Sequence, residues 1–281
     1  ASTAINAIGI IPTGGTVYYT TIENLQIDGN KANQTAGGSQ YSQNGIAIYS
    51  SGSGASIGTM IRDCWVHDCI YSGISYLGND THVSVENCHC FSNGYHGIRG
   101  DGDVRMDIVG NRCYSNSLSG IYIDAGQNCV ITGNYTQGNS SNGIAVVGAG
   151  VSNTITGNHS LSDVIGMTIN SKYSTVTGNT INDPDQTGLV IGEVGAVADY
   201  TIAIGNAIYR AGHDAITLNG IGLIISANTI IDPSYDHANT YSGIEWGAVS
   251  LTASKVIHNT IVDTQSKMKY GIMNSSGYIT N

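Results

Sequence analysis

The chain has 281 residues, with 38 glycines, only 3 prolines and a formal net charge of −10. Charged residues make up just 11%, so the clustered lysine and arginine needed to bind phosphate backbones are missing, and we expect no nucleic-acid partner. The sequence contains no run of about 18 apolar residues, so we also expect no membrane-spanning helix and no membrane partner.

The first recurring unit is a small residue, usually glycine, followed by an apolar residue, any residue and usually a second apolar residue. Successive units start 22 to 28 residues apart. Alternation of this kind over four or five positions is typical of a short β-strand. In chain order the units begin at Gly45, Gly73, Gly97, Gly120, Gly143, Gly166, Gly188, Ala215, Gly243 and Gly271.

A second unit lies between these, in which apolar residues alternate with others and the run ends on asparagine. Asp63 takes the asparagine place in an early repeat. An asparagine repeated once per coil can bond to its copy in the next coil and can also accept a left-handed bend, so we interpret these residues as structural. Examples are Val83 to Asn87, Ile131 to Asn134, Ile155 to Asn158, Val176 to Asn179, Ile202 to Asn206 and Ile224 to Asn228.

Strands this short cannot bury a face alone, but stacked coils pair each strand with its copies above and below. The repeats therefore predict one all-β domain over residues 1–281, a right-handed parallel β-helix of about ten coils. Residues 31–42 and 232–241 are predicted insertions. Residues 278–281 look like the start of another strand. We therefore expect a fragment that is open at its C-terminal end, or ends covered by a homotrimer or by further chain segments.

Several segments resemble the pectate-lyase-like superfamily of β-helices: Ile22 to Asn30, Ile61 to Asp68 and Asn87 to Gly94. Within it the chain looks most like the catalytic modules of mannuronan epimerases and the β-helices of phage tailspikes. The resemblance implies a polysaccharide partner and an extracellular, virion-surface or cell-surface location. Asp101 matches an outward aspartate of the epimerases. Their Gly-aromatic-Asp-Pro-His-Glu signature is replaced here by the stretch from Gly73 to Gly78.

The candidate catalytic residues come from the predicted direction of the side chains. In each glycine-led strand the first and third positions should point into the tube, and the second and fourth should face solvent. On two adjacent coils this brings together outward ionisable side chains within about 5 to 10 Å of each other. They are Arg99, Asp101, Tyr122 and Asp124, with His96 and Asp103 beside them.

This cluster contains the groups needed to remove the C-5 proton of a uronic acid. The reaction requires a group that neutralises the substrate carboxylate, a base and an acid. Arg99 is expected to bind the carboxylate or act as base, and Tyr122 or His96 to donate or accept a proton. The carboxylates could instead catalyse hydrolysis, or could simply pair with Arg99 on a solvated face. Calcium is an expected cofactor with three candidate ligands: Asp101, Asp103 and Asp124.

A second polar group surrounds the later insertion and includes Asp214, Asp236 and His237. Tyrosine and tryptophan rings are favourable platforms for sugar rings, although such residues can also be simple loop decoration. We predict that the substrate-binding residues are Tyr49, His213, Tyr241, Glu245 and Trp246.

Together these features predict a secreted polysaccharide-active β-helix, most specifically a lyase or epimerase that acts on a uronic-acid-containing polysaccharide. One alternative is a tailspike-like protein that binds or hydrolyses a glycan as part of a trimer. Another is a structural surface solenoid without catalysis.

Overall fold

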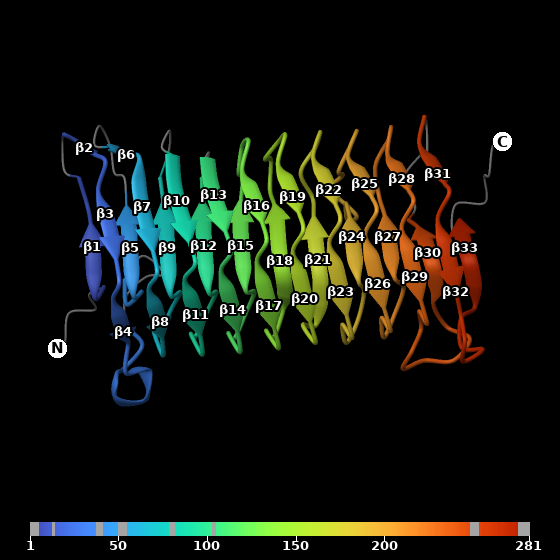
Figure 1. Ribbon diagram of the computed structural model, residues 1–281, viewed down its shortest axis with the longest axis horizontal. Helices are drawn as coiled ribbons and strands as arrows, with labels where there is room; N and C mark the ends of the chain where they lie inside the picture. The colour runs from blue at the N-terminus through green and yellow to red at the C-terminus, as the bar shows by residue number, and fades with distance from the viewer. Residues whose placement is uncertain are drawn as a thin grey trace.

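The computed structural model is a parallel β-helix, in which the chain winds through three parallel sheets that run along a tube (Figure 1). It describes residues 6–12, 15–37, 42–49, 55–78, 82–102, 105–247 and 253–274. Each complete coil contributes one strand to sheet 2, then one to sheet 3 and then one to sheet 1. Figure 1 shows the coils stacked in chain order, so the first and last strands lie at opposite ends of the tube.

The described residues form sheets of eleven, ten and ten strands. Sheet 1 contains β1 (Ile8–Ile10), β5 (Ile46–Tyr49), β9 (Ile74–Leu77), β12 (Ile98–Asp101), β15 (Ile121–Asp124), β18 (Asn142–Val147), β21 (Ile165–Ile169), β24 (Leu189–Ile191), β27 (Ile216–Leu218), β30 (Ser242–Trp246) and β33 (Tyr270–Asn274). Sheet 2 contains β3 (Thr21–Glu23), β7 (Thr59–Arg62), β10 (His82–Glu86), β13 (Arg105–Val109), β16 (Val130–Thr132), β19 (Thr154–Thr156), β22 (Thr175–Thr177), β25 (Ile202–Ile204), β28 (Ile224–Ser226) and β31 (Lys255–Ile257). Sheet 3 contains β4 (Gln26–Asp28), β8 (Trp65–His67), β11 (His89–Phe91), β14 (Arg112–Tyr114), β17 (Tyr135–Gln137), β20 (His159–Leu161), β23 (Thr180–Asn182), β26 (Ala207–Tyr209), β29 (Thr229–Ile231) and β32 (Thr260–Val262). Beside these lie a strand pair, β2 (Thr16–Tyr18) with β6 (Ala55–Ile57), and a short 3-10 helix, η1 (Lys31–Asn33).

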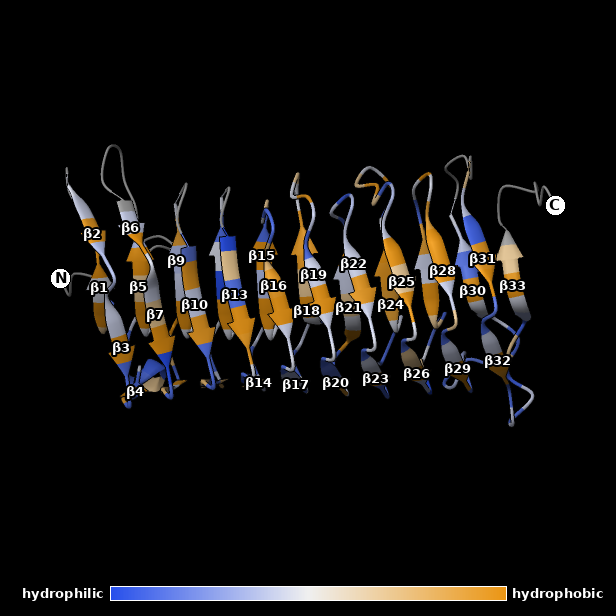
Figure 2. Cartoon of the chain, turned by 45° about the horizontal axis from the view of Figure 1, so that its top comes forward, coloured by the Kyte–Doolittle hydropathy of each residue, from blue (hydrophilic) through white to orange (hydrophobic). Residues whose placement is uncertain are grey.

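Aliphatic side chains fill the tube, as the alternation predicted. The first position after the small residue is buried on the coils from β5 to β30, and Ile121, Ile144 and Ile169 are fully buried. Hydrophobic segments recur on the strands of successive coils (Figure 2). Burial of this apolar surface is the main force that holds one coil against the next.

Asparagines form a continuous ladder at the bend between sheets 2 and 3, which confirms their structural interpretation. Asn158 is typical, because its amide nitrogen donates to the Ile131 carbonyl at 2.9 Å and to Asn179 Oδ1 at 3.0 Å. The left-handed bend itself lies one residue earlier, at Gly157 with φ +63°. The expectation that the ladder asparagine adopts this conformation was therefore wrong.

The first coils depart from this ladder. Asp63 and Asn87 occupy the left-handed position, with φ of +54° and +52°. The ladder position is taken instead by Cys64 and Cys88, whose thiols are buried and free. Asp63 therefore does not replace a ladder asparagine. Its side chain is an addition on the outside of the bend.

The second position of the sheet 1 strands is more buried than predicted. Ala47 and Ser75 have no exposed surface, and Arg99 is only 6% exposed. On two coils a side chain from the corner before the strand packs on this position of the next coil: Asn142 Oδ1 accepts from Thr168 Oγ1 at 2.7 Å, and His96 stacks on Tyr122. The outer face of sheet 1 is therefore partly covered: Ala47, Ser75 and Arg99 are buried, whereas Tyr122 and Glu245 keep some exposed surface.

The described part of the first predicted insertion, residues 31–37, and the second insertion project from the tube (Figure 1). The first contains η1, and the second joins β29 to β30. Residues 278–281, predicted to begin another strand, lie outside the described residues. Across the described ranges, no helix has the length and apolar character needed to cross a membrane.

Candidate functional site

One corner residue, directly before the small residue of each sheet 1 strand, is held in the same way on several coils. Its side chain accepts a hydrogen bond from the backbone N–H of the corner residue on the next coil, which would otherwise lack a partner. The corner therefore favours a side chain with an acceptor atom, and it fixes how that side chain lies. The acceptors and donors are Asn44 Oδ1 and Ser72 N (2.9 Å), His96 Nδ1 and Ser119 N (3.2 Å), and Asp214 Oδ1 and Ser242 N (2.6 Å).

His96 is a neutral imidazole at this corner. Burial, with a smaller contribution from the nearby Arg99 charge, lowers its pKa to about 3. Because Nδ1 accepts the Ser119 N–H, the ring proton sits on Nε2. The ring stacks on Tyr122 of the next coil, with centroids 4.4 Å apart and planes 18° from parallel. His96 is therefore a fixed hydrogen-bond donor beside a phenol.

Arg99 and Asp101 form an ion pair along β12, with Arg99 Nη2 and Asp101 Oδ2 2.7 Å apart. The Arg99 side chain is mostly buried, and its Nε has no hydrogen-bond partner within the described residues. The neighbouring Ser75 Oγ on β9 is also buried and has no partner there. Two polar groups thus lie buried side by side without a partner among the described residues, which is unusual in a folded protein.

Tyr122 and Asp124 lie on β15, directly opposite Arg99 and Asp101 in the register of the sheet. Burial and the Asp124 charge raise the pKa of Tyr122, so the phenol keeps its proton at neutral pH. Burial and the Asp101 charge raise the pKa of Asp124, which makes its carboxylate a stronger base than a free aspartate. Gly148, at φ +75°, lies next to this carboxylate, and a Cβ there would approach Asp124 Oδ1 to 2.1 Å and the Ala125 backbone nitrogen to 2.9 Å.

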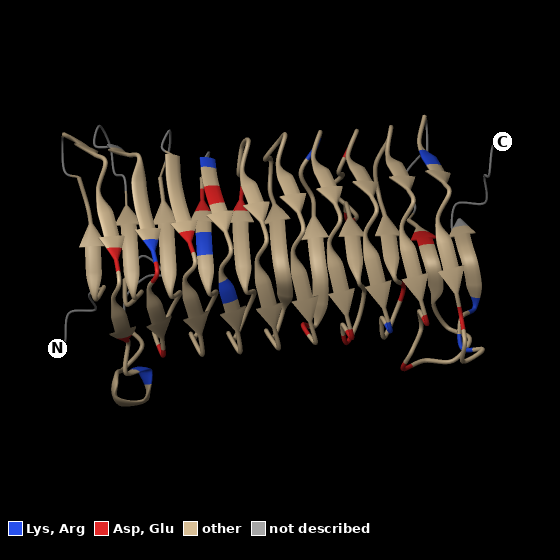
Figure 3. Cartoon of the chain, in the orientation of Figure 1, with Lys and Arg blue, Asp and Glu red and all other residues tan. Residues whose placement is uncertain are grey.

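The structure thus brings together five of the predicted residues: His96, Arg99, Asp101, Tyr122 and Asp124. Acidic and basic bands gather around β12, β13 and β15, whereas many other charges lie at bends (Figure 3). Asp103, the remaining predicted calcium ligand, lies outside the described residues. Of the two described ligands Asp101 is already bound to Arg99, so the described residues do not make a complete calcium site.

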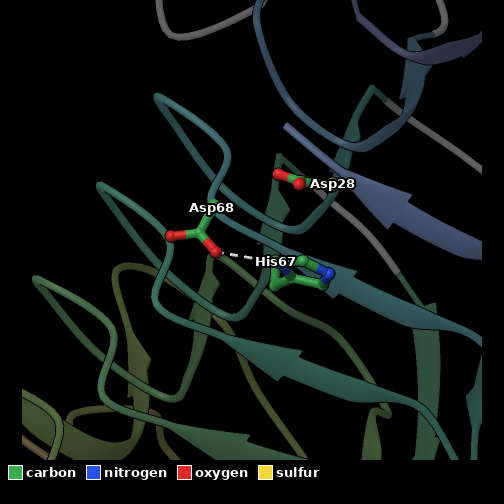
Figure 4. Close-up of side chains that lie close together, drawn as sticks. All are labelled: Asp28, His67 and Asp68. Atoms are coloured by element: carbon green, nitrogen blue, oxygen red, sulfur yellow. Dashed lines mark hydrogen bonds and ion pairs between the residues drawn. The ribbon is translucent and has the colours of Figure 1, made fainter. Parts of the chain in front are cut away.

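A different group has its potential metal-ligand atoms within 4.8 Å of one another, namely Asp28, His67 and Asp68 (Figure 4). Each already has a protein partner. His67 Nδ1 lies 2.9 Å from Asp68 Oδ2, and Asp28 Oδ1 accepts the Asn30 N–H at 2.8 Å. Lys31 Nζ lies 3.9 Å from Asp68 Oδ1 and supplies a positive charge. We interpret this group as a hydrogen-bonded cluster that stabilises the bend.

The second predicted group lies on the same sheet but farther along the tube. Five strand spacings separate Tyr122 from Glu245, about 24 Å. Glu245 contacts the corner residue Asp214, whose pKa is raised to about 7 by burial and by the Glu245 carboxyl, while the Ser242 N–H opposes the shift. His213 stacks on Tyr241, with centroids 4.2 Å apart. These residues form a separate carboxyl pair beside an aromatic cluster.

The other two predicted substrate-binding residues take different places. Trp246 packs into the hydrophobic core, so its ring is not open to a sugar outside the tube, and that prediction was wrong. It occupies the third position, which points inward. Tyr49 lies two strands from Asp101, about 10 Å away, because Leu77 stands between them in the register. Tyr49 therefore borders the first cluster.

The corner position is the functional feature that sequence reasoning missed. It combines a structural hydrogen bond with a titratable group on two coils, at His96 and at Asp214. A signal for it exists in the sequence, since a polar residue recurs directly before the small residue that leads each strand. The hydrogen bond that this polar residue makes depends on the packing of one coil against the next, and the alternation within a strand gives no information about that packing.

The fold has solved relatives of several kinds. The A-module of a mannuronan C-5 epimerase from Azotobacter vinelandii has a TM-score of 0.63 at 17% identity, over 97% of this chain and 80% of that chain. The Dettilon tailspike protein has a TM-score of 0.61 at 14% identity, over 91% and 60%. A DFA-IIIase from Arthrobacter chlorophenolicus, solved without its lid in complex with GF2, has a TM-score of 0.69 at 12% identity, over 95% and 86%. At these identities the likeness shows the fold alone.

At the level of sequence, no curated protein matches the chain. The family model described as a right handed beta helix region matches residues 6–160, more than half of the 281 residues. This match agrees with the three parallel sheets and with the expected hand of the coil. The chain belongs to the right-handed β-helix family.

Proposed function

We propose that the protein is a polysaccharide lyase or epimerase that acts on uronic-acid units at His96, Arg99, Asp101, Tyr122 and Asp124. One observation carries this proposal. A neutral histidine is stacked on a protonated tyrosine beside a buried arginine, and a carboxylate with a raised pKa lies on the same strand as that tyrosine. A base, an acid and a cation for the substrate carboxylate are all present in this arrangement.

In the proposed reaction Arg99 and the His96 Nε2–H bind the uronate carboxylate and stabilise the negative charge that develops on it. The Asp124 carboxylate takes the C-5 proton. In a lyase, the Tyr122 hydroxyl then gives its proton to the O-4 leaving group while the C4–O bond breaks and a C4–C5 double bond forms. In an epimerase, Tyr122 gives its proton to C-5 from the opposite face. Exchange with water restores Asp124 and Tyr122 after each turnover.

The structural relatives support the class of substrate in this proposal. One is named as a mannuronan C-5 epimerase, and another is a tailspike. With the resemblance of the sequence, they also support a secreted or surface protein that binds a polysaccharide. The amounts of cell-bound and released protein test the proposed location. The mass of the protein in solution tests the proposed homotrimer.

A panel of alginate, polygalacturonate and a glycosaminoglycan tests the proposed reaction. A lyase creates a conjugated double bond that absorbs in the ultraviolet, and an epimerase changes the anomeric proton signals in NMR without shortening the chain. Arg99→Lys is expected to lose activity, because lysine keeps the charge but lacks the bidentate fork that fits a carboxylate. No change in any polymer of the panel would contradict the proposal and favour a structural solenoid.

Calcium stays a prediction, with Asp101 and Asp124 as its described ligands and Asp103 as the third. If it is required, a chelator should abolish turnover and added calcium should restore it. Turnover that is unchanged by the chelator would show that Arg99 and His96 serve the substrate carboxylate without calcium.

Glycoside hydrolysis is a second candidate function, favoured by the carboxyl pair of Asp214 and Glu245. A raised pKa favours the protonated form of Asp214 up to about pH 7, as a general acid requires, and Glu245 is the second carboxyl group that a glycosidase needs. Hydrolysis produces new reducing ends without the ultraviolet absorbance of an elimination product. Glu245→Gln should abolish this release and leave the lyase or epimerase activity intact, since Glu245 lies about 24 Å from Tyr122.

A further inference from the structure

An open pocket of about 380 Å³ lies at the bend between sheets 2 and 3 on the first coils. It is on a different face from the site described above, which occupies sheet 1. The pocket forms where β3 leads into β4 and β7 leads into β8. Its lining residues are Asn24, Leu25, Gln26, Asp63 and Trp65.

The indole ring of Trp65 lines this pocket and is covered on one face. His89 of the next coil stacks on the covered face, with centroids 4.9 Å apart and planes 6° from parallel. Gln26, the register partner of Trp65 on the preceding coil, reaches across to His67 Nε2 at 3.2 Å. Trp65 is 49% exposed, so a large aromatic surface remains in contact with water.

Polar side chains stand beside that ring at the left-handed bend. Asn24 and Asp63 have φ of +56° and +54°, and neither side chain has a hydrogen-bond partner among the described residues. In the middle coils the same bend is glycine, as at Gly133 and Gly157, where the backbone is less strained. The first coils therefore carry an amide and a carboxylate where other coils carry no side chain.

We propose that this pocket binds one neutral pyranose ring of a glycan. The C–H face of such a ring packs on the open indole of Trp65, and its hydroxyls bond to Asn24 and Asp63. No arginine or lysine lines the pocket, and the neighbouring Arg62 is paired with Glu23, so the negative charge of Asp63 disfavours a uronate. The inference goes beyond the proposed reaction, and it implies a polysaccharide that contains neutral as well as acidic sugars.

Tryptophan fluorescence tests this proposal directly, because the chain has only two tryptophans and Trp246 is buried in the core. The probes are the methyl pyranosides of glucose, galactose and mannose, N-acetylglucosamine, and galacturonate as the acidic comparison. We expect at least one neutral probe to shift the emission of the wild type in a saturable way, and galacturonate to bind more weakly. In Trp65→Ala the remaining emission should not respond.

Two variants remove the polar groups without disturbing the bend, namely Asn24→Gly and Asp63→Gly, because glycine occupies this bend in the middle coils. Each should weaken binding of the neutral probe by about tenfold, as the loss of a hydrogen bond to the sugar predicts. The matched control is Tyr173→Ala, which removes an exposed ring stacked on Tyr200 elsewhere on the tube. It should bind as the wild type does.

Two outcomes would overturn the proposal. One is the absence of any saturable emission change with every neutral probe. The other is wild-type affinity in both glycine variants. The test is separate from that of the proposed reaction, because Tyr122→Phe should lose turnover and still bind the neutral probe with unchanged affinity.

Discussion

At His96 and Asp214 a single corner position serves folding and, in the proposed reactions, chemistry as well. In each side chain one atom accepts a hydrogen bond from a backbone N–H of the next coil. The remaining part of each side chain lies against a titratable residue of that coil, Tyr122 for His96 and Glu245 for Asp214. The structural bond thus orients the group that takes part in chemistry, which is how a rigid scaffold positions an active-site side chain.

The raised pKa of Asp214 predicts a dependence of stability on pH. An aspartate in the unfolded chain has a pKa near 3.9, whereas Asp214 in the folded protein titrates at about 7. The folded protein therefore holds a proton between these values that the unfolded chain has released. The stability from this proton is fully present below about pH 4 and is lost as the pH rises through about 7.

Asp214→Asn should consequently lose less stability between pH 4 and pH 7 than the wild type does. Urea unfolding at several pH values measures this difference. Asp185→Asn, at an exposed carboxylate, is the control and should follow the wild type. An identical pH dependence in the wild type and in Asp214→Asn would show that Asp214 is ionised throughout this range.

Strands and bends were the elements best predicted from the sequence, because each depends on a pattern that repeats within one coil. The strands of sheet 1 begin where the apolar residue follows the small one, as at Ile121 and Ile216. The burial of the second position could not be read from the same pattern. Ser75 and Arg99 are buried although the alternation places them on the outward side of their strands.

The inward ladder predicts that a buried charge will be strongly destabilising. Ile121→Asp, Ile144→Asp and Ile169→Asp each place a carboxylate in the filled tube, at a cost of about 3 to 5 kcal/mol. Chemical denaturation measures the loss. Thr260→Asp, on an exposed outward position of β32, should change stability by less than about 0.5 kcal/mol. Wild-type stability in all three isoleucine variants would contradict the inward assignment.

The asparagine ladder makes a prediction of the same kind. Asn158→Ala removes the donor to the Ile131 carbonyl and the acceptor for the Asn134 N–H, leaving both groups buried without partners. We expect a loss of about 3 kcal/mol in the free energy of unfolding. Asn182→Ala, which removes one partly buried contact to His159, should cost under about 1 kcal/mol. Equal losses would mean that the ladder adds no special stability.

At the scale of the whole molecule, the repeats in the sequence predicted the fold, but they predicted the candidate site only in part. Stacking in register places Arg99 opposite Tyr122 and Asp101 opposite Asp124, and the repeat spacing already contained that information. The ion pair of Arg99 with Asp101 and the tautomer of His96 depend on packing between coils, which no repeat length contains. The pocket at Trp65 depends in addition on the direction of the Gln26 side chain, which contacts His67 Nε2.

The tube also limits how the two polar clusters can work together. They lie on one sheet about 24 Å apart, and each coil contacts only its neighbours. A change at one cluster should therefore leave the other intact. Separate activities at the two places would appear as two independent losses in Tyr122→Phe and Glu245→Gln.

The most direct test of the central claim is the turnover of Tyr122→Phe on the uronate polymer that the wild type converts. The substitution keeps the stacked ring on His96 and removes only the hydroxyl. If Tyr122 is the acid, turnover should fall by a factor of about 10² to 10⁴, with a melting temperature close to that of the wild type. Full turnover in this variant would contradict the proposed site.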